Sequence, residues 1–272
     1  MPPPDKPATP GVASMIPEQR REQMLRQLRK HQVLSVHQLM DMFECSHMTV
    51  RRDIALLEQQ GRAYSVTGGV RIASQLHSEP SHDSKAVVEL PHKQAMARVA
   101  ANLLHPDMTI YLDAGTTTLE IVPYITALSG MTVITNDFGI VHALAEANHV
   151  DVIHTGGLLD HPNISSVGGL AAATLRQLAT DIAFISTSSW DLQRGTTTPS
   201  ALKVEVKQAA MQSASCNVLI ATSSKYGTFG MYKVAELEQF DTLISDDSLP
   251  PASADSIRRQ RIELLLASPL VS

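Results

Sequence analysis

One short segment combines the residue types that bind anions in loops. Residues 113–118, with the sequence DAGTTT, follow an apolar run at 109–112 that is typical of a buried strand. Gly115 lets the backbone approach an anion, and the first free amides of a following helix and three threonine hydroxyls can donate hydrogen bonds to it. The spacing of a P-loop is absent. The segment therefore indicates a phosphate-binding loop, with helix capping by the threonines as the alternative.

Three further groups of polar residues and glycines follow predicted strands. Because ligands of open parallel α/β sheets bind beyond the carboxyl ends of the strands, we expect these groups to meet the 113–118 loop. Lys225 can neutralise a phosphate, and Asn136 and Asp113 can bind sugar hydroxyls. Each group alone could also serve as a cap or a turn. The three groups are Thr135-Asn136-Asp137, Thr155-Gly156-Gly157 and Ser223-Ser224-Lys225.

A sheet is needed to position these groups. From Lys93 onward, apolar runs alternate with amphipathic stretches, which predicts a parallel sheet covered by helices, an α/β domain over 93–272. The predicted strands are 109–112, 131–135, 150–154, 182–186, 218–221 and 242–245. The predicted helices are 92–104, 117–128, 139–147, 171–178, 202–214 and 254–266.

A second group of residues has the chemistry of DNA contact. Ser46 can cap a helix whose apolar residues recur on one face and which ends at Gly61. The opposite face carries side chains that can reach phosphates or base edges, although two arginines on a helix can also be an ordinary solvated face. The outward side chains are His47, Thr49, Arg51 and Arg52.

The elements around that helix predict a winged helix-turn-helix domain over 15–72. A helix over 18–31 comes first, and Ser35 can cap a short second helix that ends near Phe43. After the Ser46 helix, two short strands at 63–66 and 70–72 flank Thr67, Gly68 and Gly69, which form the turn of a wing. The order of helix, capped break, helix and hairpin is that of a DNA reader whose recognition helix enters the major groove.

Composition limits the remaining possibilities. The chain has 272 residues and a net charge of −5. Residues 15–72 carry nine basic and six acidic residues, whereas residues 73–272 carry 12 basic and 20 acidic residues. This distribution fits a small domain that binds a polyanion, attached to a larger acidic domain. No apolar run is long enough to span a membrane and no signal peptide is readable, so we expect a cytoplasmic protein. The two cysteines exclude a disulfide framework, and the spacing of the 11 histidines predicts no metal site.

Two segments lie outside the predicted domains. Residues 1–14 are rich in proline and predict a disordered tail, and Met15 is a candidate native start. Residues 73–92 are polar with two prolines, which predicts a linker that can hold local helix.

Residues 35–70 resemble the DNA-binding signature of DeoR-type bacterial regulators. The positions that match in order are Ser46, Thr49, Val50, Arg51, Arg52, Asp53, Leu57, Glu58 and Gly61. Thr67 stands where that family usually has a histidine before the Gly-Gly pair. The resemblance implies that the DNA-contacting residues are Ser35, Ser46, His47, Thr49, Arg51, Arg52, Thr67, Gly68 and Gly69.

The second domain also resembles that family. DAGTTT at 113–118 and Ser-Ser-Lys at 223–225 are similar to motifs of its sensor domain, a Rossmann-like fold similar to ribose-5-phosphate isomerase that binds phosphorylated sugars. The implied effector-binding residues are Asp113, Gly115, Thr116, Thr117, Thr118, Asn136, Gly156, Gly157 and Lys225. Thr222 stands where the family usually has Asp, and residues 186–189 replace its common Gly-Ala-Asp-Gly stretch, which favours a smaller or more acidic phosphorylated effector.

Together these features predict a transcriptional regulator without enzymatic activity or cofactor. We expect a repressor of a carbohydrate or sugar-acid catabolic operon that binds a double-stranded DNA operator as a homodimer or homotetramer. The alternative is an enzyme like a phosphosugar isomerase with an appended DNA-binding module, in which Asp113, Glu205 or Lys225 would act as the general base.

Overall fold

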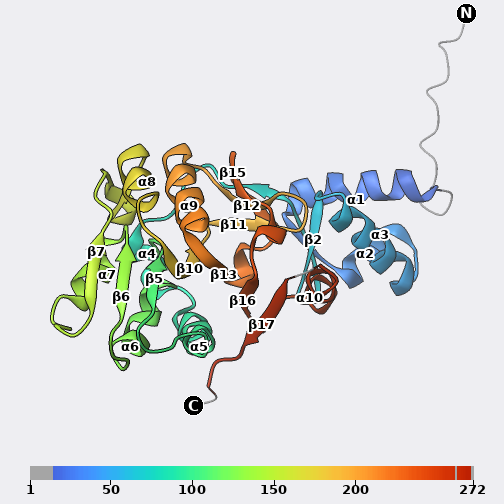
Figure 1. Ribbon diagram of the computed structural model, residues 1–272. Helices are drawn as coiled ribbons and strands as arrows, with labels where there is room; N and C mark the ends of the chain where they lie inside the picture. Colours follow the sequence, from blue (N-terminus) through green and yellow to red (C-terminus); the bar gives the residue numbers. More distant parts are fainter. Residues whose placement is uncertain (1–14, 261, 271–272) are drawn as a thin grey trace, which may run out of the picture. The chain divides into compact units, whose positions relative to one another are not determined.

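The computed structural model describes residues 15–260 and 262–270, so the proline-rich segment 1–14 lies outside the described residues. The chain divides into two compact units, with the boundary between Ala73 and Ser74 (Figure 1). Within the described residues, no helix has both the length and the apolar character needed to cross a membrane.

The first unit is a three-helix domain with a small antiparallel sheet. Its sheet has the strand order β1-β3-β2, and β2 and β3 form the predicted wing. The short strand β1 between the first two helices was not predicted; it pairs with β3 and closes the sheet onto the helices. The elements are α1 (Pro17–His31), β1 (Val33–Ser35), α2 (Val36–Phe43), α3 (His47–Gln59), β2 (Ala63–Val66) and β3 (Gly69–Ile72).

The predicted caps and apolar faces build this unit. The Oγ of Ser35 accepts a hydrogen bond from the Gln38 amide at 3.1 Å, and the Oγ of Ser46 accepts one from the Thr49 amide at 3.2 Å. One face of each helix is buried in a common core, which is the main source of stability for helices of this length. The buried side chains are Met24, Leu25, Leu28, Leu39, Phe43, Val50, Ile54 and Leu57.

The second unit is built on a seven-stranded parallel sheet with the order β17-β16-β13-β10-β5-β6-β7. All six predicted strands are present, with ends that differ by a few residues. They are β5 (Thr109–Leu112), β6 (Thr132–Thr135), β7 (Asp151–His154), β10 (Thr180–Ser186), β13 (Ala214–Ile220) and β16 (Thr242–Asp246).

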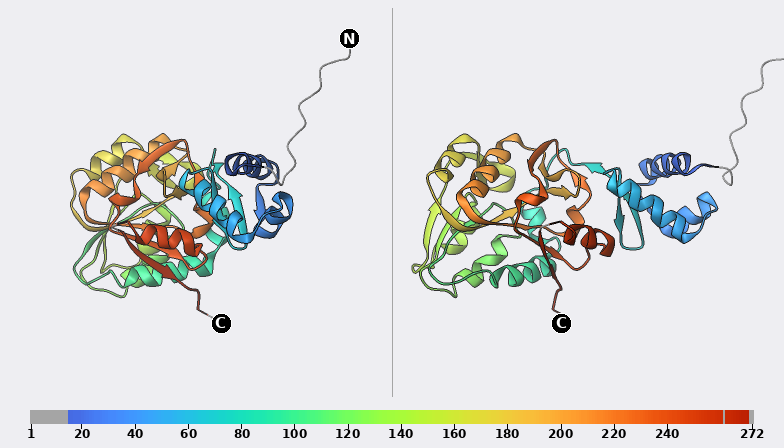
Figure 2. Two further views of the ribbon diagram at one scale, coloured as in Figure 1. Left: turned by 90° about the vertical axis from the view of Figure 1, so that its right-hand side faces the viewer. Right: turned by 45° about the vertical axis from the view of Figure 1, so that its right-hand side comes forward.

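Helices cover both faces of this sheet. In Figure 1, α8 (Gly169–Leu175) and α9 (Ala201–Ser213) lie on the opposite side of the sheet from α5 (Leu90–Ala101) and α6 (Val122–Ile125). The views of Figure 2 show the same two layers, with the orange α9 and the blue-green α5 on opposite faces. A further helix, α7 (Phe138–Leu144), follows β6. The architecture is the predicted α/β fold.

Two predicted helices are wrong in part. The helix predicted at 254–266 ends early, because α10 (Pro251–Arg258) is followed by an edge strand, β17 (Glu263–Ala267), that pairs with β16. The apolar run 264–266 is compatible with a helix face or with a strand. It forms a strand because it pairs with the edge of β16 that would otherwise be free. The helix predicted at 117–128 is split into a 3₁₀ turn, η2 (Leu119–Ile121), and α6, because Pro123 has no amide hydrogen to continue a helix.

Smaller elements surround the sheet. The predicted linker 73–92 belongs largely to the second unit, where it contains β4 (Ser74–Gln75) and α4 (His82–Val87) and leads into α5. Strand β4 pairs with β14 (Thr228–Phe229). The other additions are β8 (Leu158–Asp160), β9 (Ser165–Val167), β11 (Ser189–Asp191), β12 (Gly195–Thr198) and β15 (Tyr232–Ala235).

Candidate functional site

One cavity of the second unit lies where the central strands end. Its volume is about 400 Å³, and residues that directly follow β5, β6, β10 and β13 line it, together with α9 and the segment 76–93. Six of the nine residues predicted to bind an effector are in its wall. They are Asp113, Gly115, Thr116, Thr117, Asn136 and Lys225.

The other three predicted residues do not line the cavity. The Thr118 hydroxyl is fully buried and donates to the carbonyl oxygens of Asp113 at 2.6 Å and Gly115 at 2.8 Å, so it shapes the loop. Gly156 is exposed with φ +64°. A Cβ at Gly157 would lie 3.0 Å from the Cβ of Ala171, so this glycine allows the backbone to pack against α8. Gly156 and Gly157 thus form a tight turn that packs against α8, and they do not line the ligand cavity.

Two amides of the 113–118 loop are occupied by contacts within the protein. The amide of Ala114 donates to Asn136 Oδ1 at 2.9 Å, and that of Gly115 donates to Asp137 Oδ2 at 3.0 Å. These two amides are therefore not free, and a 3₁₀ turn, η2, follows the loop in place of the predicted helix; anion binding by the later amides of the loop stays a prediction. Thr116 and Thr117 are buried in the cavity wall, and their hydroxyls have no hydrogen-bond partner within the described chain.

Asp113 is neutralised inside the protein. Its carboxylate forms a buried ion pair with Lys207 on α9, and it accepts hydrogen bonds from the amide of Ser186 at 2.9 Å and from the Ser186 hydroxyl at 2.7 Å. Lys207 also donates to the Ser186 carbonyl at 2.9 Å. Such a network fixes the ends of β5 and β10 relative to α9, because breaking a buried pair leaves an uncompensated charge.

Lys225 and Lys93 bring positive charge to the cavity without a paired carboxylate. Lys225 Nζ donates to the carbonyl oxygen of Thr187 at 2.8 Å, and Lys93 Nζ donates to the carbonyl oxygen of Lys85. Neither forms an ion pair within the described residues. Burial, together with the positive charge of Lys85, lowers the pKa of Lys225 to about 8, and the charge of Glu79 acts in the opposite direction.

The charges of the cavity wall are unbalanced. Five lysines line it against three carboxylates, which leaves two excess positive charges inside a unit that is acidic overall. Lys203 and Lys207 are four residues apart on α9 and so lie on one face of that helix, a spacing that can be seen in the sequence. The lysines are Lys85, Lys93, Lys203, Lys207 and Lys225, and the acids are Glu79, Glu89 and Asp113.

The remaining polar groups of the wall are mostly engaged. Asn136 donates from Nδ2 to the Ser166 carbonyl at 2.9 Å, while its Oδ1 also accepts from Tyr111 at 2.9 Å, so it holds the loops together. Ser165 is different, because its Oγ is buried in the cavity wall and has no hydrogen-bond partner in the described structure. Buried hydroxyls without partners are uncommon, which marks this wall as one that a ligand can complete.

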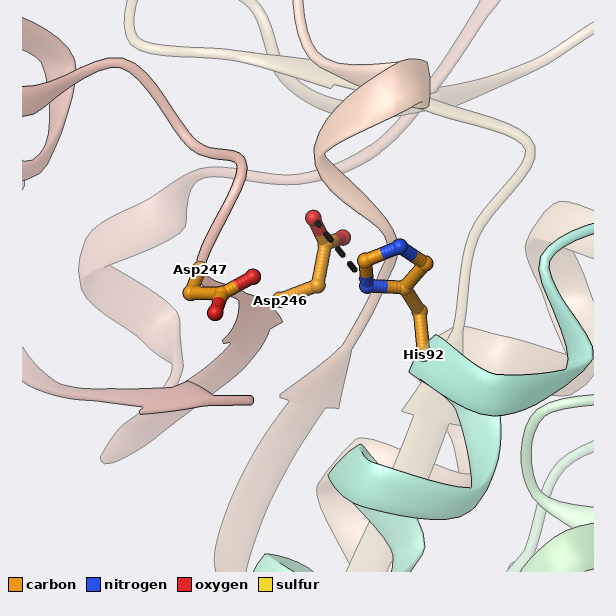
Figure 3. Close-up of side chains that lie close together, drawn as sticks. All are labelled: His92, Asp246 and Asp247. Atoms are coloured by element: carbon orange, nitrogen blue, oxygen red, sulfur yellow. Dashed lines mark ion pairs between the residues drawn. The ribbon is translucent and has the colours of Figure 1, made fainter. Parts of the chain in front are cut away.

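A His-Asp-Asp cluster lies behind the Ser-Ser-Lys turn. His92 Nδ1 is 3.9 Å from Asp246 Oδ1, and Asp247 lies beside them (Figure 3). The Asp246 carboxylate accepts hydrogen bonds from the Ser223 amide at 2.6 Å and from the Ser223 hydroxyl at 2.7 Å. Asp246 thus positions the turn that carries Lys225, and we assign no ion to this cluster.

In the first unit, α3 presents the predicted polar face. Arg51, Arg52 and His47 are exposed, and neither arginine forms an ion pair within the described residues. Asp53 on the opposite side is buried, and its carboxylate pairs with Arg20 at 2.6 Å and with Arg21 at 3.2 Å. These ion pairs fix α3 on α1 and so orient the arginines outward.

Of the residues predicted to contact DNA in the wing and at the helix caps, some are exposed and others have a structural role. Thr67 and Gly68 are exposed at the hairpin turn, whereas Gly69 is buried where a Cβ would overlap the carbonyl oxygen of Leu34. Gly69 is thus required by packing. Ser35 and Ser46 cap α2 and α3, and the Ser46 hydroxyl also hydrogen-bonds the Thr49 hydroxyl at 2.9 Å.

Both units match known family models. Residues 20–76 match the DeoR-like helix-turn-helix domain, and residues 89–247 match the DeoR C-terminal sensor domain. Residues 77–88 lie between the two matches.

Similar full-length proteins are regulators by name. The chain is 44% identical to an uncharacterized HTH-type transcriptional regulator of Haemophilus influenzae, over 93% of this chain and 98% of that one. It is 41% identical to the regulator YgbI of Escherichia coli, over 93% and 99%. A putative aga operon transcriptional repressor of Escherichia coli O157:H7 is 29% identical over 91% and 93%.

A solved structure resembles part of the fold. Ribose 5-phosphate isomerase A of Methanocaldococcus jannaschii matches with a TM-score of 0.36 and 15% identity, over 49% of this chain and 53% of that one. With matches to both family models and relatives that span nearly its whole length, the chain belongs to the DeoR family of DNA-binding transcriptional regulators.

Proposed function

We propose that this regulator is a repressor whose affinity for its operator is controlled by a phosphorylated sugar or sugar acid bound in the cavity of the sensor domain. The observation that carries the proposal is the excess of two positive charges in the cavity wall, where Lys93 and Lys225 have no paired carboxylate. A phosphate monoester carries a charge of roughly −1.5 to −2 near neutral pH, which would balance this excess.

The shape and hydrogen-bonding groups of the cavity support a small polar ligand. A volume of about 400 Å³ is within the usual range for small-molecule sites. The hydroxyls of Thr116 and Thr117 can donate to phosphate oxygens, and the Ser165 hydroxyl can pair with a sugar hydroxyl. Because the acids of the wall are largely engaged with lysines, an acidic ligand suits this site better than a neutral one.

The direction of regulation is supported by a relative. A protein named as an aga operon repressor aligns over nearly the whole chain, which favours repression here. We infer that ligand binding shifts the sensor domain between arrangements with different operator affinity, and a coupling of about 1–3 kcal/mol is ordinary for such linkage.

DNA recognition would use the exposed arginines of α3 and the tip of the wing. Arg51 and Arg52 can contact phosphates or guanine edges, and a homodimer or homotetramer would place two such helices on repeated half-sites. A regulator that binds chromosomal DNA would act in the cytoplasm.

Two of the three bases proposed for the enzyme alternative, Glu205 and Asp113, are poorly placed for that role, whereas Lys225 lines the cavity. Glu205 is exposed on α9 and does not line the cavity. Asp113 is paired with Lys207 and accepts two hydrogen bonds from Ser186 at the same carboxylate oxygen, so the protein already compensates its charge.

The test is a selection of bound DNA at fixed salt. The full chain is incubated with fragmented genomic DNA, alone and with each member of a panel of sugar phosphates and sugar acids. We expect a few intergenic sites to be enriched and then lost with one phosphorylated compound. Equal recovery of all fragments in every condition would contradict the proposal, and so would a response only to an unphosphorylated neutral sugar.

A further inference from the structure

The segment 76–89, which we name the strap, is part of the ligand cavity. It contributes Glu79, Lys85 and Glu89 to the wall, although most of it lies between the two stretches that match known domains. It begins three residues after Ala73, so it is also the stretch of chain through which the DNA-binding unit is attached to the sensor domain.

Polar contacts hold the strap in place. None of its residues is fully buried, although the Glu79 side chain is only 11% exposed, and the valines at the end of α4 are 75% and 55% exposed. At one end the Leu76 amide donates to the Phe229 carbonyl at 2.7 Å, and at the other the Ser224 hydroxyl donates to Glu89 at 2.9 Å. A segment with so little apolar burial opens at low free-energy cost once its polar contacts are exchanged for others.

The central contact of the strap is an ion cluster around Glu79. Its carboxylate is 2.8 Å from Lys203 Nζ and 3.3 Å from Lys85 Nζ, and it also accepts a hydrogen bond from the Thr198 hydroxyl at 3.4 Å. Burial alone would raise the pKa of Glu79, but Lys203 and Lys85 lower it to about 2. The carboxylate is therefore charged at every physiological pH and pairs with two lysines of the cavity.

We propose that Glu79 is an internal counter-anion that the anionic group of the ligand displaces from Lys203, which releases the strap from α9. This inference rests on the proposed function, since it requires an anionic ligand in the same cavity. A phosphate dianion offers three oxygens and about twice the charge of a carboxylate, so it can replace Glu79 as the partner of Lys203, whereas the pair of Glu79 with Lys85 lies within the strap. A neutral sugar cannot displace the Glu79 carboxylate. Glu79 therefore makes the cavity selective for anionic ligands.

The displacement also gives the ligand a physical route to the DNA-binding unit. Lys203 belongs to α9 and is fixed in the sensor domain by its helix and by a second ion pair with Asp160 at 3.3 Å. Glu79 belongs to the strap. A ligand that replaces Glu79 as the partner of Lys203 therefore leaves the fold of the sensor domain unchanged. Only the strap becomes less ordered.

The test compares Glu79→Gln with the wild-type full chain, with inorganic phosphate as the probe. Glu79→Asp keeps the charge, and Glu238→Gln removes a charge at an exposed position outside the cavity. Phosphate affinity is measured by calorimetry, and amide hydrogen exchange of peptides covering 76–89 is measured with and without phosphate at constant ionic strength.

We expect Glu79→Gln to bind phosphate about tenfold more tightly than wild type, because the competing carboxylate is gone. Its strap should exchange quickly without phosphate, whereas the wild-type strap should exchange faster only when phosphate is added. Glu79→Asp and Glu238→Gln should remain close to wild type. Equal or weaker phosphate binding by Glu79→Gln, or protection of the wild-type strap by phosphate, would overturn the inference and leave the proposed function standing. Absence of phosphate binding in both proteins would instead count against the phosphate site itself and the displacement with it.

Discussion

The ammonium group of Lys225 donates a hydrogen bond to the carbonyl oxygen of Thr187 across 2.8 Å, and within the described chain no carboxylate pairs with it. The other lysines near it are bound to Glu79 or Asp113, or donate to a backbone carbonyl. This half-buried cation lies among other cations, an arrangement that a bound anion would stabilise.

Replacement of Lys225 by methionine should abolish the ligand response without affecting DNA binding in the absence of ligand. The loss of one charge-assisted hydrogen bond corresponds to about ten- to a hundredfold weaker effector binding. Calorimetry with the compound found in the selection would measure the affinity, and gel shifts on the enriched operator would measure DNA binding. Lys233→Met, which removes an exposed lysine, serves as the control. Loss of operator binding by a folded Lys225→Met protein would contradict the proposal that the first unit binds DNA and the second binds the effector.

Effector affinity should fall as the pH rises through about 8. Burial lowers the pKa of Lys225 to about 8, so the lysine is largely charged at neutral pH and loses its charge in mildly alkaline solution. The anion binds the charged form, and therefore binding takes up a proton in this range. Titrations from about pH 7 to about pH 9 in buffers of different ionisation enthalpy would detect this uptake. Affinity that stays constant over the range in wild type, as we expect only for Lys225→Met, would contradict the role of this charge.

Arg51→Ala should weaken operator binding by about 1–3 kcal/mol. Arg51 is exposed on the outward face of α3 and forms no ion pair in the described structure, so its removal should leave the fold unchanged. If Arg51 contacts a phosphate, the slope of log affinity against log salt should decrease by about one. Arg26→Ala, which removes an exposed arginine of α1, is the matched control. An equal loss in both variants would indicate a general charge effect and not a contact made by α3.

Gly69→Ala should destabilise the first unit more than Gly68→Ala. A Cβ at Gly69 would overlap the carbonyl oxygen of Leu34, which forces the backbone of β1 or β3 to move. Gly68 has open space around it and φ +75°, so its replacement costs only the strain of that conformation, about 1 kcal/mol. Urea unfolding followed by circular dichroism would rank the two variants. The reverse order would show that the wing is not packed as the structure has it.

The sequence was informative wherever a structural feature depends on neighbouring residues. Ser46 and the apolar positions of α3 predict that helix because a cap and a helical repeat act within one or two turns. The apolar strands β5 and β6 were predicted with nearly correct ends for the same reason. Prediction failed at 264–266, where the local pattern fits both a helix and a strand. Pairing with β16, which no local pattern shows, makes this run a strand.

The candidate site shows the same division. The sequence by itself determined a winged helix, a parallel α/β sheet and a polar loop at 113–118, since these depend on local patterns and on the common direction of parallel strands. Only the tertiary structure decided which cations meet there. Glu79 and Lys203 are 124 residues apart, and no spacing rule connects residues at such a separation. Folding of the strap across the strand ends brings them together, because buried charges are stable only where an opposite charge compensates their loss of hydration.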